Sequence, residues 1–102
     1  MNPLRTRRDI EIDFVKACNQ SKELMDISQS LVKIARSDMA ETMAMMRSGW
    51  KGENAESFYE KTEELRGELM NNAEDLLKIA NHIHHTADII YNAEMIAIGV
   101  CS

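Results

Sequence analysis

The stretch Ser48-Gly49-Trp50-Lys51-Gly52-Glu53-Asn54 divides the 102 residues of the chain almost in half. It contains the only Trp and two of the four Gly, whereas the residues on both sides repeat their apolar side chains with helical spacing. Gly49 suits the left-handed conformation that ends a helix, and Asn54 suits the cap of the next helix. The sequence therefore predicts two long helices, at about 9–48 and about 54–97, joined by a turn at 49–53 and followed by a short tail.

The composition is that of one folded domain covering residues 1–102, with 44% hydrophobic and 28% charged residues. The net charge of −5 argues against nucleic-acid binding, which needs a basic surface. No apolar run approaches the roughly 18 residues that span a bilayer. Acidic residues follow Arg5, Arg7 and Arg8, where a signal peptide needs an apolar segment. We therefore expect no nucleic-acid partner, no stable membrane insertion and no signal peptide.

Both predicted helices carry wide apolar stripes that include small residues, which would permit close approach of the helix axes. A two-helix hairpin buries only one face of each helix, and such small units rarely stabilise themselves alone. The sequence therefore predicts an all-α fold, an antiparallel two-helix hairpin that dimerises with a second hairpin as a four-helix bundle. The small residues are Ser21, Ser28 and Ala35 in the first helix and Ala73, Ala80 and Ala87 in the second, whose stripe also includes Ala55, Phe58, Thr62 and Leu65.

Eight apolar side chains of these stripes are the candidate partner interface. Three of them are methionines near the turn, where flexible side chains would form an adaptable contact surface. For each single Met, packing in the chain's own core is the alternative. The eight residues are Met39, Met43, Met46, Leu24, Leu31, Leu69, Leu76 and Ile83.

No pattern in the sequence indicates catalysis, because no acid–base carboxylate pair and no Gly-rich phosphate loop is recognisable. His82, His84 and His85, with Asp88, resemble a set of metal ligands, but two or three ligands on one exposed helix make an incomplete site. Solvated His side chains or a pH-sensitive interface are the alternatives. We therefore expect no enzymatic activity, no cofactor and no metal.

Cys18 and Cys101 are not expected to form a disulfide within the chain. In the register of a hairpin, Cys18 would lie beside residues near 84, so Cys101 would be about 25 Å farther along the helix. A disulfide requires Cα atoms within about 7 Å of each other.

A chain of about a hundred residues with two long helices and a central Trp50-Lys51-Gly52 turn, followed by Ala55 and Phe58, resembles the Trp-Xaa-Gly (WXG) family of type VII secretion. The resemblance implies pairing with another small helical hairpin, as a homodimer or heterodimer, and passage through a membrane secretion ATPase. It also implies residence in the bacterial cytoplasm before export, and then secretion or display at the cell surface. Trp50 and Gly52 would form the turn that serves export and partner binding.

Members of this family often carry a Tyr-Xaa-Xaa-Xaa-Asp/Glu export signal after the second helix. Here Glu94 follows Tyr91 at a spacing of three, while Tyr59 and Glu63 have the family's spacing but lie at the start of the second helix. Tyr91 and Glu94 still share a helical face, so a degenerate signal and simple packing of Tyr91 are both open.

The departure from the signal favours a partner that escorts the N-terminal helical region of a secreted toxin. Such a partner would contribute the Trp-Xaa-Gly part of a composite export signal. A self-dimerising secreted substrate is one alternative. A cytosolic helical adaptor or chaperone with no export role is the other.

Overall fold

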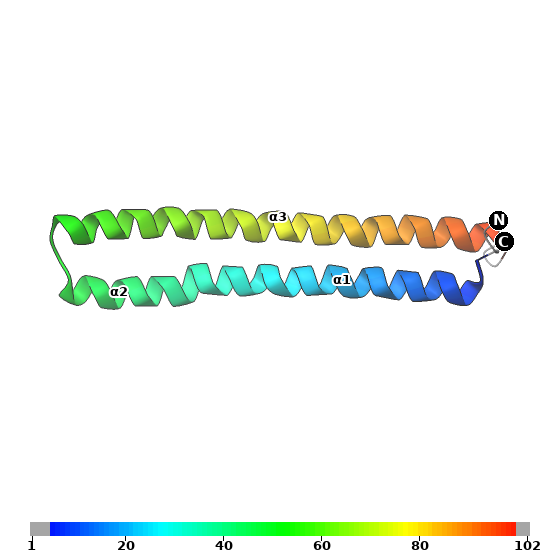
Figure 1. Cartoon of the computed structure of the whole chain (residues 1–102), viewed down its shortest axis with the longest axis horizontal. Helices are drawn as coiled ribbons and strands as arrows, with labels where there is room; N and C mark the ends of the chain where they lie inside the picture. Colours follow the sequence, from blue (N-terminus) through cyan, green and yellow to red (C-terminus); the bar gives the residue numbers. More distant parts are fainter. Residues whose placement is uncertain (1–4, 100–102) are drawn as a thin grey trace. The chain divides into compact units, whose positions relative to one another are not determined.

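The computed structural model describes residues 5–99, and every regular element among them is helical. α1 spans Arg7–Lys33, a π-helical segment η1 spans Ile34–Asp38, α2 spans Met39–Gly49 and α3 spans Glu53–Ala97 (Figure 1). The predicted all-α class is confirmed, since residues 5–99 contain no strand. None of these helices combines the length and the hydropathy needed to cross a membrane. Cys101 lies outside the described residues.

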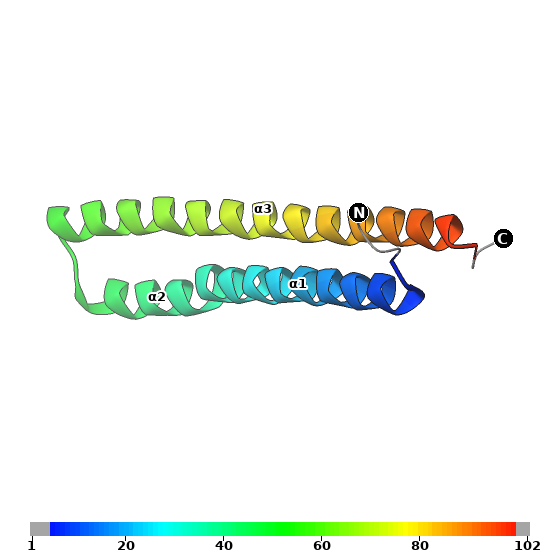
Figure 2. The ribbon, with the colours of Figure 1, turned by 45° about the vertical axis from the view of Figure 1, so that its right-hand side comes forward.

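The contacts within the chain form two compact units. The described part of unit 1 consists of residues 5–25 and 78–99, and unit 2 consists of Asp26–Leu77. In each unit a segment from the first half of the chain lies beside a segment of α3, and the two views of the ribbon agree on this (Figures 1 and 2).

In unit 1, α1 contacts α3 through small residues. Ser21 and Ala80 are buried, and the Ser21 hydroxyl donates a hydrogen bond to the carbonyl oxygen of Ala80 at 2.8 Å. A serine side chain is short, so it reaches the backbone of a neighbouring helix only where the two axes approach closely. Ala87 is also buried, as its place in the stripe predicts. Cys18 is half-buried and its thiol is free.

Unit 2 repeats the same contact. The Ser28 hydroxyl donates to the carbonyl oxygen of Ala73 at 2.6 Å, and both residues are buried together with Ala35. At the turn end of the unit, the hydrophobic cluster is built from Met43, Ala55 and Tyr59 with Met46 packed against it. Within this end of α3, Tyr59 takes the buried position, whereas Phe58, a residue of the predicted apolar stripe, is exposed.

The apolar stripe predicts one continuous α-helix in the first half of the chain. The structure differs, because η1 separates α1 from α2. In η1 the N–H of Met39 donates to the carbonyl oxygen of Ile34, five residues earlier instead of four. This wider turn adds one residue to the local repeat. The buried positions are therefore seven residues apart from Ser21 to Ala35, but eight apart from Ala35 to Met43.

The turn between α2 and α3 differs from the prediction in both of its caps. Gly49 is the last residue of α2 and does not take the left-handed conformation; Gly52 has the positive φ, at 117°. Trp50 is extended, and its N–H donates to the carbonyl oxygen of Met46 at 2.7 Å. The second helix starts at Glu53, so Asn54 lies within its first turn and not at its cap. The reversal in chain direction therefore takes place at residues 50–52 and depends on Gly52.

α1 begins at Arg7, two residues before the predicted start, because Thr6 and Asp9 form a reciprocal cap. The N–H of Asp9 donates to Thr6 Oγ1, and the N–H of Thr6 donates to Asp9 Oδ2, both at 3.1 Å. This is the capping-box arrangement, with Asp in place of the usual Glu. The hydrogen bonds from the Thr6 backbone and then from its side chain lower the pKa of Asp9 below its ordinary value of 3.8.

We predict that Thr6→Ala lowers the free energy of unfolding by about 1 kcal/mol, because it removes the hydroxyl that accepts from Asp9. The lowered pKa of Asp9 means that its carboxylate stabilises the folded chain at neutral pH. This contribution should be lost as the pH falls below about 4, through the pKa of Asp9 in the folded chain. Urea titrations of the wild type and of Thr6→Ala at pH 7 and pH 3, followed by circular dichroism, measure both effects. A Thr6→Ala chain as stable as the wild type at pH 7 would contradict the role of the Thr6 hydroxyl in the reciprocal cap.

Candidate functional site

An aromatic cluster surrounds the turn of unit 2 and includes the central Trp. The ring of Trp50 lies 5.4 Å from Phe58 and 6.0 Å from Tyr59 between centroids, and Phe58 lies 6.1 Å from Tyr59. Trp50 and Phe58 are each 41% exposed, whereas Tyr59 is only 2% exposed. The three rings therefore form a cluster in which the ring of Tyr59 is buried and the rings of Trp50 and Phe58 face solvent.

Tyr59 stabilises the turn through its hydroxyl and its ring. Its hydroxyl donates to the carbonyl oxygen of Trp50 at 2.8 Å, and the guanidinium of Arg47 lies 4.2 Å from the centre of its ring. A cation over an aromatic face adds an electrostatic attraction to the packing. Gly52 provides the positive φ that a residue with a Cβ rarely adopts. The hydroxyl of Tyr59 and the conformation of Gly52 thus hold the backbone at Trp50, while the indole of Trp50 stays accessible.

A shallow apolar hollow lies next to this cluster, between α2 and the start of α3. It has a volume of about 260 Å³ and is lined by Met39, Met43 and Met46 from α2 and by Phe58 from α3, with Asp38, Thr42 and Thr62 completing the lining. Met side chains adapt their shape to a neighbour, so this surface suits a variable apolar partner group.

More apolar side chains are exposed along the same side of unit 2. Ile27 and Ile34 come immediately before Ser28 and Ala35, and Leu65 comes immediately before Arg66. In an antiparallel helix pair, the residues that precede the central contact positions lie on one common side. Phe58 occupies the equivalent place before Tyr59, which connects this side to the hollow.

The opposite side of the turn end is acidic. A second open hollow there is lined by Arg47 and Tyr59 and by four carboxylates, Glu56, Glu60, Glu63 and Glu64. Unit 2 therefore presents an apolar side and a charged side, and the charged side reads as an ordinary solvated surface.

The eight candidate interface residues lie closer to the contact between helices than the sequence indicated. Met43 is only 5% exposed, inside the hydrophobic cluster of unit 2, so it contributes one wall of the hollow and little open surface. The other seven are half-buried. Larger exposed fractions belong instead to apolar residues that the candidate set omitted, such as Ile27 and Leu65. The half-buried residues are Met39, Met46, Leu24, Leu31, Leu69, Leu76 and Ile83.

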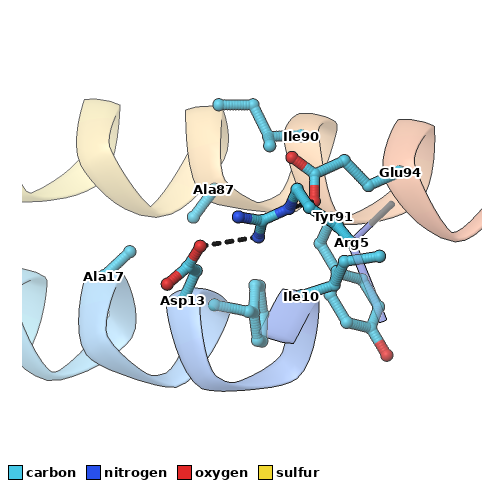
Figure 3. A pocket seen from close by; sticks show the side chains of 9 residues that line it. Arg5, Ile10, Asp13, Ala17, Ala87, Ile90, Tyr91 and Glu94 are labelled. Carbon is cyan, nitrogen blue, oxygen red and sulfur yellow. Dashed lines mark hydrogen bonds and ion pairs between the residues drawn. The ribbon is translucent and has the colours of Figure 1, made fainter. Parts of the chain in front are cut away.

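Tyr91 and Glu94, the candidate export signal, lie in unit 1 and are engaged there. The ring of Tyr91 packs against Phe14 with centroids 4.7 Å apart. Glu94 accepts a hydrogen bond from Arg5 Nε at 2.9 Å, and Arg5 also pairs with Asp13 at 2.6 Å. Figure 3 shows the guanidinium of Arg5 between these two carboxylates, at the edge of a hollow of about 230 Å³. These hydrogen bonds, first to Asp13 and then to Glu94, raise the pKa of Arg5.

The three histidines do not form a metal centre. His82, His84 and His85 are exposed, and His84 Nδ1 lies 3.4 Å from Asp88 Oδ2 in the next helical turn. Among residues 5–99, no three His, Cys, Asp or Glu side chains lie close enough together to hold a metal ion.

Sequence reasoning missed several residues that shape this site. Tyr59 and Arg66 follow the same seven-residue spacing as Ala73 and Ala80, and that spacing indicates contact with the first half of the chain. The step from Ala35 to Met43, by contrast, looks irregular until the π-helical segment is known.

Comparisons of the chain with family models, with curated proteins and with solved structures find no match.

We predict that Tyr59→Phe lowers the free energy of unfolding by about 1 kcal/mol, because the Trp50 carbonyl loses its buried donor. The fluorescence of the only Trp should also shift to longer wavelength as the turn loosens. Urea unfolding followed by this fluorescence measures both effects. Tyr91→Phe is the matched control, since the ring contact of Tyr91 with Phe14 does not need the hydroxyl. An equal response of the two variants would contradict the role assigned to the Tyr59 hydroxyl.

Proposed function

We propose that the chain is a non-enzymatic binding module of type VII secretion, acting as a substrate or as a targeting partner. It would bind another helical hairpin, or the N-terminal helical region of a secreted toxin, and contribute the Trp-Xaa-Gly part of a composite export signal. The observation that carries the proposal is the open aromatic pair, because Trp50 and Phe58 are each 41% exposed above the buried Tyr59. Aromatic side chains of this kind are the usual anchors of protein interfaces.

The apolar side of unit 2 supports the same proposal. A partner helix that covers Ile27, Ile34 and Leu65 would remove large exposed apolar side chains from water. Burial of apolar area contributes about 25 cal/mol per Å², so several such residues supply a substantial part of a binding energy. The Met-lined hollow beside Phe58 would accept an apolar side chain of the partner. Trp50 would then lie at the end of the interface, where its indole meets both partner and solvent.

For the whole chain we propose a single antiparallel two-helix hairpin that pairs with a second hairpin as a four-helix bundle. The second hairpin is either another copy or a different chain. Pairing of this type covers the apolar sides of both partners, which one hairpin leaves open. The secretion ATPase would be the next partner, and export would move the protein from the bacterial cytoplasm to the medium or the cell surface.

Tyr91 and Glu94 contribute less to the proposed export signal than the turn does. Their contacts with Phe14 and Arg5 favour packing as the role of Tyr91. An export signal at these residues would require the pairs to open first. The Trp50 turn, which is already exposed, is therefore the part of the signal that we assign to this chain.

We predict that Trp50→Ala lowers partner binding and export at least about tenfold, because it removes an anchor residue from the interface. Export is measured as the protein found in the medium of intact bacteria that carry a type VII system. Lys51→Ala is the matched control, since it changes the neighbouring exposed residue of the same turn. Circular dichroism of both variants should show unchanged helix content.

The outcomes separate the alternatives. Unchanged export of Trp50→Ala would remove the turn from the signal, and absence of the wild-type chain from the medium would favour a cytosolic adaptor or chaperone. Light scattering measures the assembly state. A stable dimer with a mass of twice 11.6 kDa that does not bind the helical region of a toxin favours a self-dimerising substrate. A defined complex that forms only with the toxin region favours the escort role.

A further inference from the structure

Arg66 occupies a position in unit 2 that small residues occupy elsewhere along α3. It follows the seven-residue spacing of Ala73 and Ala80, yet it is a long cation and is only partly buried. Its Nε–H donates to the carbonyl oxygen of Ala35 at 2.6 Å. Its Nη1 also contacts both carboxylate oxygens of Glu63 at 2.9 Å. The guanidinium therefore connects α3 to the backbone of the π-helical segment.

The accepting carbonyl belongs to η1, the π-helical segment that lies between α1 and α2. Ala35 is the second residue of η1, in which Met39 N–H pairs with Ile34 five residues back. π-helical segments are rare and short, because they disturb the regular hydrogen bonds of an α-helix. A hydrogen bond from a charged donor is among the stronger ones available to a protein carbonyl. Arg66 thus stabilises the backbone at the point where the helix departs from the α form.

The π-helical segment decides which side of α2 faces α3. One residue of an α-helix corresponds to a rotation of about 100° and a rise of about 1.5 Å. With the extra residue of η1, Met43 is buried against Tyr59 while Thr42 is exposed. In a continuous α-helix, Thr42 would lie seven residues after Ala35 and would take the place that Met43 has.

We propose that Arg66 is a positioning residue: by binding the carbonyl of Ala35 it holds the π-helical segment, and through that segment it selects Met43 for the contact with Tyr59. The same selection places Met39 and Met46 along the hollow beside Phe58. The inference rests on the contacts within unit 2 and is independent of the partner proposed above.

The test uses the full chain and nuclear magnetic resonance. In Arg66→Met, the nuclear Overhauser effect between the Met43 methyl group and the Tyr59 ring should weaken or disappear. Exchange of the Met39 amide should become about tenfold faster, as expected for loss of a hydrogen bond to a charged group. Glu63→Gln is the matched control, because it removes the ion pair of Arg66 and leaves the hydrogen bond to Ala35. It should retain both wild-type signals.

Deletion of Ser37 provides the rescue. Without this residue, a continuous α-helix places Met43 seven positions after Ala35, so the contact with Tyr59 no longer needs a π-helical segment. The Met43–Tyr59 signal should then be the same with Arg66 and with Arg66→Met. If Arg66→Met alone fails to fold, the comparison in the chain without Ser37 still tests the role of Arg66.

Two results would overturn the proposal. One is a wild-type Met43–Tyr59 signal and a wild-type Met39 exchange rate in Arg66→Met. The other is a loss of the signal, or of folding, that Arg66→Met causes equally with and without Ser37.

Discussion

The close contact between helices at small side chains is the constraint on which the rest of each unit depends. In unit 2, the Ser28 hydroxyl reaches the backbone of Ala73 at 2.6 Å, and in unit 1 the Ser21 hydroxyl reaches Ala80 at 2.8 Å. Such bonds require that no large side chain separates the helices. The larger apolar residues are therefore displaced from the centre of the contact to its flanks. Exposed Leu65 beside the central positions is a direct consequence, and so is an apolar side that a partner can cover.

The turn end of unit 2 follows a different principle, because larger side chains replace the small ones there. Met43 and Tyr59 fill the contact, and the hydroxyl of Tyr59 binds the turn through the carbonyl of Trp50. The ring of Tyr59, which is only 2% exposed, contacts the exposed ring of Trp50, so the surface of Trp50 is supported from within the chain. A binding turn on a fixed support loses little conformational freedom when it binds. This is the physical reason why an open aromatic pair on a rigid turn supports a role in recognition.

The sequence predicted the all-α class and the small residues of the contact correctly, because periodicity directly reflects burial on a helix. Details that depend on tertiary contacts were beyond that reasoning. The choice of Gly52 over Gly49 depends on where the chain reverses, and the choice of Tyr59 over Phe58 depends on the register of two helices. The π-helical segment needs Arg66 from a distant part of the chain, and no local pattern indicates such a segment. The Thr6 cap was readable from its spacing to Asp9 and was overlooked.

The most direct test of the account is the stability of Ala73→Leu, which places a large side chain in the contact that Ser28 and Ala73 share. Urea unfolding followed by circular dichroism should show a loss of about 1–3 kcal/mol, since overpacking forces the helices apart. Ala44→Leu, at an exposed position of α2, is the control and should remain close to the wild type. An Ala73→Leu variant as stable as this control would contradict the claim that small side chains and close helix approach determine the structure.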